Sequence, residues 1–331
     1  MGINNLIQFL SLRFPEVFHV TPSIDHFAGC NVFIDCAILL QRSLHAAATG
    51  VLRRRRQEYL RASEAERQYI DARGIRVEIC NHAAKPLLRL NQEIRAVKSK
   101  GGIKATFVLG SSLTVRDLYI ASKVGGDGKG ANVLDSRNPH LLNCLRAFFE
   151  GKPVARLYAS PSEKDILVIA QRLMDAFARI EIRQPDIAQR CVEFCEDDDY
   201  VLSDDTNAIA FGAPNVIRDY CGRNVCNTLN HNRMLDIMGF SRQQFIDFCV
   251  LCGSDDTSLI PHIGPERAYH IISSFGDLQG FLESPALDAV LQSPNVAKIL
   301  EKRQITVEQL RERVGDVEAL RGAFDIRRAR T

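Results

Sequence analysis

Residues 32–35 read Val-Phe-Ile-Asp, three apolar residues that end on an acid, and a run rich in Leu and Ala follows them. The first segment is typical of a buried strand and the second of a helix. Two further apolar runs have strand length, GIKATFVL at 102–109 and YVLS at 200–203, and the acidic pair Asp204-Asp205 follows the latter. Strands that alternate with helices predict an α/β fold with a central, mostly parallel sheet flanked by helices.

The composition is that of a globular protein with a full core. The chain has 331 residues, of which 46% are hydrophobic, and 42 Lys and Arg stand against 40 Asp and Glu. This length predicts one large unit with a smaller one appended. The near-zero net charge would not by itself attract nucleic acid, so any basic surface that binds it must be local. No run approaches the roughly 18 apolar residues of a membrane span, which predicts neither membrane association nor export.

The ten cysteines show no organised spacing, which indicates a reducing compartment. Cys249 and Cys252 have the spacing of metal ligands, but no second pair lies at zinc-finger distance and the segment FIDFCVLC reads as a buried helix. We therefore expect these two thiols in the core.

Charge density rises over residues 51–75, where Arg53 to Arg56 precede a mixture of Glu and Arg. This pattern predicts a charged insertion or a solvated helix, and a nucleic-acid patch remains the alternative.

Several acids stand at the points where strands end or helices begin. Because the carboxyl ends of neighbouring parallel strands share one rim of a sheet, we expect these acids to gather there. Clustered carboxylates repel one another and need cations, and hard oxygen ligands select magnesium or manganese. The acids are Asp35, Glu163, Asp165, Asp205 and Asp255.

Five segments carry a resemblance to a known family in their order along the chain. They are MGINNLIQFL (1–10), VFIDCA (32–37), PSEKD (161–165), LSDDTNAIAFG (202–212) and LCGSDDTSLIPHIGPERA (251–268). Together they resemble the flap endonuclease family of XPG-type structure-specific nucleases, as a divergent member whose divergence would suit a viral source. The resemblance implies a PIN-like nuclease core over 1–234, with an arch-like region at about 113–150, and a helical duplex-binding region over 235–331 with a helix-hairpin-helix-type element.

The resemblance also implies roles for single residues. The five acids above would be metal ligands, and Gly2 would be exposed after removal of Met1. Two positions depart from the family pattern: Leu109 stands where an Asp is expected and cannot coordinate a metal, and Asn207 stands where a second Asp is expected and can offer a carbonyl oxygen. These departures predict a weakened or rearranged metal site.

Basic residues and one turn complete the implied site. Arg116 and Lys123 follow Leu109 at the family's spacing, and seven residues is two helical turns, so both cations would share one helix face toward the scissile phosphate. The Ile263-Gly264 turn, with Arg267 after it, would hold duplex DNA through backbone amides. The family usually has a basic residue where this chain has Glu266, which predicts a looser grip.

The implied activity is divalent-metal-dependent hydrolysis of phosphodiesters in branched or 5′-ended DNA. Two ions are expected, Mg²⁺ or, better tolerated by an imperfect site, Mn²⁺. An RNA endonuclease of the same fold, or a protein that only binds branched nucleic acid, remain open. We expect a monomer whose partner is nucleic acid, without a sliding-clamp motif, in the nucleus or another intracellular site of DNA replication, the cytoplasm included.

Overall fold

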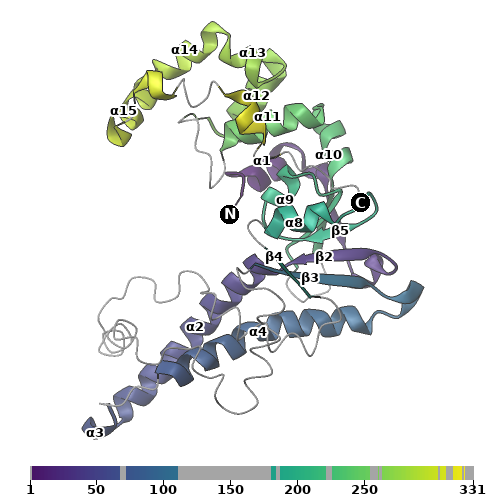
Figure 1. The fold of residues 1–331 in the computed structure, drawn as a ribbon, viewed down its shortest axis with the longest axis vertical. Helices are drawn as coiled ribbons and strands as arrows, with labels where there is room; N and C mark the ends of the chain where they lie inside the picture. Colours follow the sequence, from purple (N-terminus) through teal and green to yellow (C-terminus); the bar gives the residue numbers. More distant parts are fainter. Residues whose placement is uncertain are drawn as a thin grey trace. The chain divides into compact units, whose positions relative to one another are not determined.

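The computed structural model describes residues 2–67, 72–110, 180–183, 187–220, 226–253, 260, 263–304, 306–310, 316–322 and 324 (Figure 1). The chain divides into two compact units. The first comprises Met1–His26, Cys30–Phe33 and Ala188–Thr331, and the second comprises Phe27–Gly29 and Ile34–Ile187.

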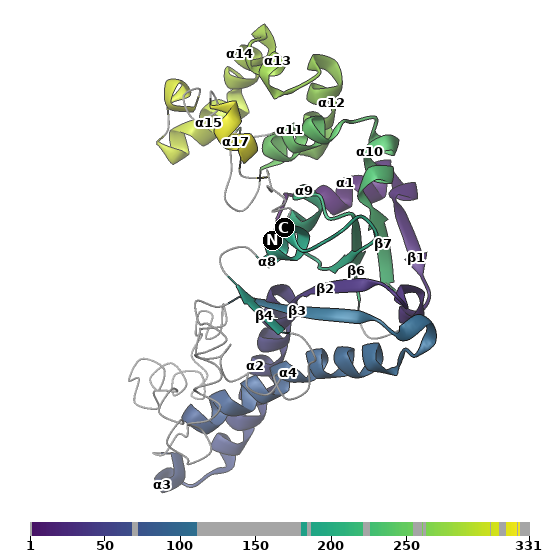
Figure 2. The ribbon, with the colours of Figure 1, turned by 45° about the vertical axis from the view of Figure 1, so that its right-hand side comes forward.

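In the described part of the chain, seven strands form one sheet in the order β1-β7-β6-β5-β2-β3-β4. β5 and β6 pair in parallel, as do β3 and β4, whereas β7 runs antiparallel to both β6 and β1. The sheet is therefore mixed, with an antiparallel edge at β7 and β1 (Figure 2). The strands are β1 (Phe18–Thr21), β2 (Asn31–Asp35), β3 (Lys104–Gly110), β4 (Ile180–Arg183), β5 (Tyr200–Leu202), β6 (Asn215–Arg218) and β7 (Cys226–Asn230).

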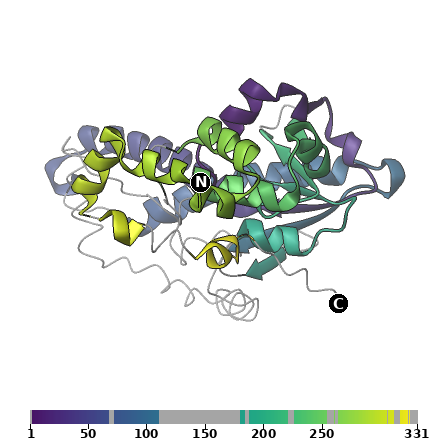
Figure 3. The ribbon, with the colours of Figure 1, turned by 90° about the horizontal axis from the view of Figure 1, so that it is seen from above.

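Helices make up most of the first unit outside the sheet. Figure 3 follows its carboxyl-terminal helices from green to yellow. Short polar signals delimit them: Ser241 and Gln244 form a reciprocal capping box at the start of α11, and Gly253 ends that helix at φ 75°. The helices are α1 (Leu6–Arg13), α8 (Ile187–Glu193), α9 (Asn207–Ala210), α10 (His231–Met238), α11 (Arg242–Cys252), α12 (Pro265–Phe275), α13 (Leu278–Leu282), α14 (Pro285–Leu291), α15 (Pro294–Arg303) and α17 (Val317–Gly322). The 3-10 turns are η1 (Pro15–Val17) and η2 (Ile24–Phe27), the latter ending in the second unit.

The second unit contains a hairpin of two long helices, α2 (Cys36–Arg61) and α4 (Ala72–Ala96), which lie side by side (Figure 1). Apolar residues at helical spacing explain their packing, because they form a buried stripe along each helix. In the sequence, α3 (Glu64–Arg67) comes between α2 and α4, and η3 (Ser99–Gly101) connects α4 to β3. The stripe of α2 is Leu40, Leu44, Ala48 and Val51, and that of α4 is Ile79, Ala83, Leu87, Leu90 and Ile94.

The strands predicted around 32–35, 102–109 and 200–203 are confirmed as β2, β3 and β5. The α/β fold class is confirmed as well. β1 lies in a segment where the sequence indicated no strand. Within the charged segment, residues 51–61, 64–67 and 72–75 are helical.

The cysteine prediction for α11 is confirmed, because Cys249 and Cys252 are both buried. Burial raises the pKa of both thiols, which keeps them protonated. None of the described helices combines the length and the apolar character needed to cross a bilayer.

Candidate functional site

The turn after β5 holds Asp205 in a fixed orientation. The backbone N–H of Asp205 donates to the Ser203 hydroxyl at 2.9 Å, and the Asn207 N–H donates to Asp205 Oδ1 at 3.0 Å. Asp205 is 7% exposed and Asn207 is 9% exposed. The carboxylate therefore caps the start of α9 in a site that is nearly closed to water.

Gly2 packs directly on this turn. Its φ is +92°, and a Cβ added to it would lie 2.4 Å from Asp205 Oδ1 and 2.3 Å from Thr206 Oγ1. The Thr206 hydroxyl also donates to the Ile3 carbonyl at 3.3 Å. Both the conformation and the space admit only glycine. The predicted roles of Gly2 and Asp205 thus fall on residues that lie in contact.

The amino-terminal segment also reaches the end of α11. Asn4 donates its backbone N–H to the Gly253 carbonyl at 3.1 Å and its side-chain amide to the Cys252 carbonyl at 3.4 Å. Gly253 stands two residues before Asp255 in the sequence. Residues 2–4 therefore join the turn of Asp205 to the segment that leads to another predicted ligand.

The side-chain oxygen of Asn207 can still accept a hydrogen bond or bind a cation. Its Oδ1 is buried and has no hydrogen-bond partner among the described residues. A buried acceptor left unpaired costs roughly 1–3 kcal/mol. A hard amide oxygen beside a carboxylate is the kind of donor that a divalent cation, or a water bound to one, would satisfy. The residues present at this turn therefore fit the metal that the sequence predicts.

Asp35 ends β2 and belongs to the second unit. It is 2% exposed, and the next residue, Cys36, is fully buried. Burial and then the Asp35 charge raise the pKa of the Cys36 thiol, whereas a backbone hydrogen bond with Val108 lowers it. Asp35 is thus a strand-end acid in a buried setting, as predicted.

The metal set as a whole extends beyond the described residues. Among those that the structure describes, no group of three or more His, Cys, Asp or Glu could hold a metal ion. Leu109 has no exposed surface. Five predicted site residues lie outside the described ranges: Arg116, Lys123, Glu163, Asp165 and Asp255.

The turn before α12 divides its residues between core and surface. Ile263 is buried, and its N–H donates to the Ile260 carbonyl at 3.3 Å. Gly264 is the N-cap of α12, whose first helical bond runs from Ala268 N–H to the Gly264 carbonyl. Gly264 and Arg267 are exposed, so they, and not Ile263, are the predicted duplex contacts that a ligand could reach.

Glu266, the departure in this turn, has a defined role within the first unit. It forms an ion pair with Arg13 of α1, and its Oε1 lies 3.3 Å from Nε2 of His270. The Arg13 guanidinium also lies 4.8 Å from the centre of the Tyr269 ring. These contacts attach α1, which follows the Gly2 segment, to α12.

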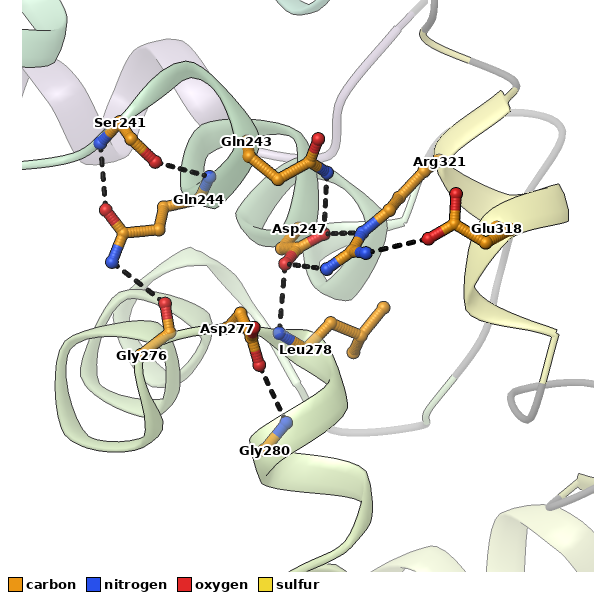
Figure 4. Close-up of polar contacts among 10 residues, drawn as sticks. All are labelled: Ser241, Gln243, Gln244, Asp247, Gly276, Asp277, Leu278, Gly280, Glu318 and Arg321. Carbon is orange, nitrogen blue, oxygen red and sulfur yellow. Dashed lines mark hydrogen bonds and ion pairs between the residues drawn. The ribbon is translucent and has the colours of Figure 1, made fainter.

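A buried ion pair fastens α17 to α11 (Figure 4). The Asp247 side chain is 0% exposed, and Arg321 donates to both of its oxygens, from Nε at 2.8 Å and from Nη2 at 2.9 Å. The Leu278 N–H at the start of α13 donates to Asp247 Oδ2 at 3.0 Å. The hydrogen bonds to Asp247 raise the pKa of Arg321, so the guanidinium stays charged. No sequence signal connects residues 247 and 321, which lie 74 positions apart.

A family model for the XPG I-region matches residues 190–255, which include Asp205, Asn207 and all of α11. Flap endonuclease 1-2 of Paramecium tetraurelia is 23% identical over 296 residues, covering 86% of this chain and 67% of the relative. The chain is similar to XPG-type flap endonucleases. Flap endonuclease 1 of Methanothrix thermoacetophila is 29% identical over 136 residues, but this match covers only 36% of the chain and 40% of the relative.

The solved structures agree with this family at the level of fold. The catalytic core of Rad2 in complex with a DNA substrate matches with a TM-score of 0.58 at 14% identity, over 99% of this chain and 86% of that one. A second Rad2 complex with DNA matches with a TM-score of 0.56 at 12% identity, over 100% and 88%. The flap-endonuclease fold is therefore present along nearly the whole chain.

Proposed function

We propose that this protein is a divalent-metal-dependent, structure-specific nuclease that hydrolyses phosphodiesters in branched or 5′-ended DNA. The observation that carries the proposal is the packing of Gly2 against the Asp205 turn, with the unpaired Asn207 Oδ1 beside it. Similarity to flap endonucleases and to the XPG I-region supports the reaction class. The named relatives are flap endonucleases, which supports the substrate class.

The roles of the residues follow from their chemistry. Asp205, Asn207 and Asp35 would hold metal through hard oxygen atoms, with Glu163, Asp165 and Asp255 completing the set. When bound, such ions lower the pKa of a coordinated water and offset charge on the leaving oxygen. Arg116 and Lys123 would bind the scissile phosphate and stabilise its charge. Gly2 holds the Asp205 turn in place, because its missing side chain allows close approach.

Asp205→Asn tests the proposal, and a substitution of the neighbouring acid is its control. Turnover of a labelled flap DNA should fall at least about 100-fold, since the substitution removes a charged metal ligand. The control is Asp204→Asn, because Asp204 Oδ1 instead accepts the Asp219 N–H at 2.8 Å. Cleavage by this control should stay within about threefold, and circular dichroism should show both variants folded.

The same assay separates the remaining alternatives. It should be run on flap DNA and on RNA of the same sequence, each in Mg²⁺ and in Mn²⁺. Faster cleavage of RNA would assign the RNA endonuclease. Tight binding without turnover in either metal would assign a protein that only binds nucleic acid. A nuclear or other intracellular location, and a monomeric state, stay predictions.

A further inference from the structure

α9 is a single helical turn that carries part of the predicted metal site. It spans Asn207–Ala210, and the Phe211 N–H donates to the Asn207 carbonyl at 2.8 Å, which closes the turn. One isolated turn is not stable in water, because its first hydrogen bond must fix several residues at once. The direction of the Asn207 side chain therefore depends on the contacts that hold α9 at its two ends.

These two ends are held from different parts of the first unit. At the start, the Asn207 N–H donates to Asp205 Oδ1, and Gly2 packs on the same turn. At the end, Arg242 of α11 donates from Nη2 to the Ala210 carbonyl at 2.7 Å. A carbonyl in the last turn of a helix has no partner within that helix, and a basic side chain is a suitable donor for it. Arg242 thus holds the end of α9 that lies opposite to Asp205.

A second contact fixes the direction of the Arg242 guanidinium. Its Nη1 lies 3.2 Å from Nε2 of His231, the first residue of α10. Because a guanidinium has only donors, Nε2 accepts this hydrogen bond and the imidazole is neutral, with its proton on Nδ1. His231 is 5% exposed, and its ring packs edge-on against Phe245, with 5.6 Å between the ring centres. The acceptor is therefore itself held in place.

Gly212 leaves the space in which this guanidinium lies. Its φ is +88°, and a Cβ added to it would lie 2.9 Å from both Cζ and Nη2 of Arg242. The Gly212 N–H donates to the Ile209 carbonyl at 3.0 Å, so the glycine is itself bonded to α9. Arg242 therefore contacts the end of α9 through close packing as well as through a hydrogen bond.

We propose that Arg242 is a positioning residue for the metal site: by holding the end of α9, it keeps the Asn207 side-chain oxygen beside the Asp205 carboxylate. The inference rests on the proposed function, since it concerns the metal that this site would bind. Residues that orient metal ligands without touching the metal commonly change its affinity by about 10–100-fold when they are substituted. The alternative is that Arg242 only fastens α11 to the core, in which case its loss would lower stability and leave metal binding unchanged.

The first measurement is thermal unfolding of the full chain without DNA, in EDTA and across titrations of Mg²⁺ and of Mn²⁺. For Arg242→Met, the metal concentration needed to raise the midpoint by a given amount should increase at least about tenfold. Arg242→Lys should lie between this variant and the unsubstituted chain, because lysine keeps the charge but lacks the planar fork that bonds two acceptors. Gly212→Ala should weaken metal binding as well, since its methyl group displaces the guanidinium without removing it.

Asn215→Ala is the control for a loss of stability alone. The Asn215 side-chain amide donates to the carbonyls of Asp197 and Asp199, at 3.2 and 3.0 Å, from the start of β6. β6 runs parallel to β5, so Asn215 lies at the opposite end of this strand pair from the Asp205 turn. This variant should have a lower midpoint in EDTA and the same response to metal as the unsubstituted chain.

Cleavage of flap DNA gives a second readout. At one low Mg²⁺ concentration, kcat of Arg242→Met should fall at least about tenfold, because a small displacement of a ligand is costly to the reaction. The loss should shrink as Mg²⁺ is raised, since a weakened site fills at higher concentration. A loss that is independent of Mg²⁺ would contradict a role in metal positioning.

Two further results would overturn the inference. The Arg242 variants could respond to metal as the unsubstituted chain does, or Asn215→Ala could lose its response to the same degree as they do. The nuclease proposal fails independently. A chain that cuts flap DNA equally well with and without Arg242 loses this inference alone. A chain that never cuts, but whose response to metal depends on Arg242, retains the inference and loses the proposed function.

Discussion

Gly2 has a backbone conformation that L side chains rarely adopt, and it also lies against the Asp205 turn. Gly2→Ala should therefore cost the roughly 1–2 kcal/mol of a left-handed alanine and, in addition, displace Asp205 and Thr206. We expect a lower free energy of unfolding in urea and at least about a tenfold loss of flap cleavage.

Gly239→Ala is the matched control for this substitution. Gly239 also has a positive φ, of 70°, but nothing lies within 4 Å of an added Cβ. It should show the backbone cost of about 1 kcal/mol and unchanged cleavage. If Gly2→Ala matched Gly239→Ala in both stability and cleavage, the close packing at Gly2 would not contribute to cleavage.

Asn207→Asp tests the unpaired oxygen of Asn207. Without metal, a second buried carboxylate beside Asp205 should lower the thermal midpoint, because like charges repel and burial disfavours the charged form. Added Mg²⁺ should restore the midpoint, and the variant should bind Mg²⁺ more tightly than the unsubstituted chain does. Thermal unfolding in EDTA and across a Mg²⁺ titration measures both effects.

The control for this charge is Asn295→Asp, at an exposed position in the first turn of α15. Its midpoint should not respond to Mg²⁺. A midpoint of Asn207→Asp that is equally insensitive to Mg²⁺ would argue against a metal at this turn.

At the scale of elements, the Asp247–Arg321 pair decides whether α17 stays on α11. Arg321→Ala would leave Asp247 buried without its cation, which typically costs about 3–5 kcal/mol. We expect a lower urea midpoint and faster proteolysis after residue 304. Limited digestion followed by mass spectrometry measures the second effect.

Glu318→Gln is the control, because Glu318 pairs with the same Arg321 from the surface, where its side chain is 85% exposed. An exposed pair of this kind contributes at most about 1 kcal/mol. Equal effects of the two substitutions would mean that the buried carboxylate is not what retains α17.

Local signals explain which elements were predictable. The segment FIDFCVLC was expected to form a buried helix and lies in α11, whose capping box and terminal glycine are both visible in the sequence. β1, β6 and β7 were not predicted, because they are short and partly polar. They are stabilised by pairing with strands that can lie far away in the sequence. β1, for example, pairs Phe18 with Leu229. Pairing over such distances leaves no local pattern.

At the scale of the whole molecule, the sequence predicted the chemistry of the site better than it predicted the contacts that hold the surrounding elements together. Strand-end acids and the family resemblance pointed to Asp35, Asp205 and Gly2; Asp35 and Asp205 are buried and Gly2 packs on the Asp205 turn, and their roles in a metal site stay predictions. The ion pair of Asp247 with Arg321 was not predictable, since either residue alone is an ordinary charge on a helix.

The contacts of Gly2, Ile3 and Asn4 also constrain how the chain folds while it is being synthesised. Asn4 bonds to Cys252, which lies 248 residues further along. At about 5–20 residues per second, the ribosome needs roughly 12–50 s to produce that partner. The α2–α4 hairpin has its own contacts and can form well before then. The contact of Asn4 with the end of α11 can therefore form only long after residues 2–4 have been made, whereas their contact with the Asp205 turn needs a shorter stretch of chain.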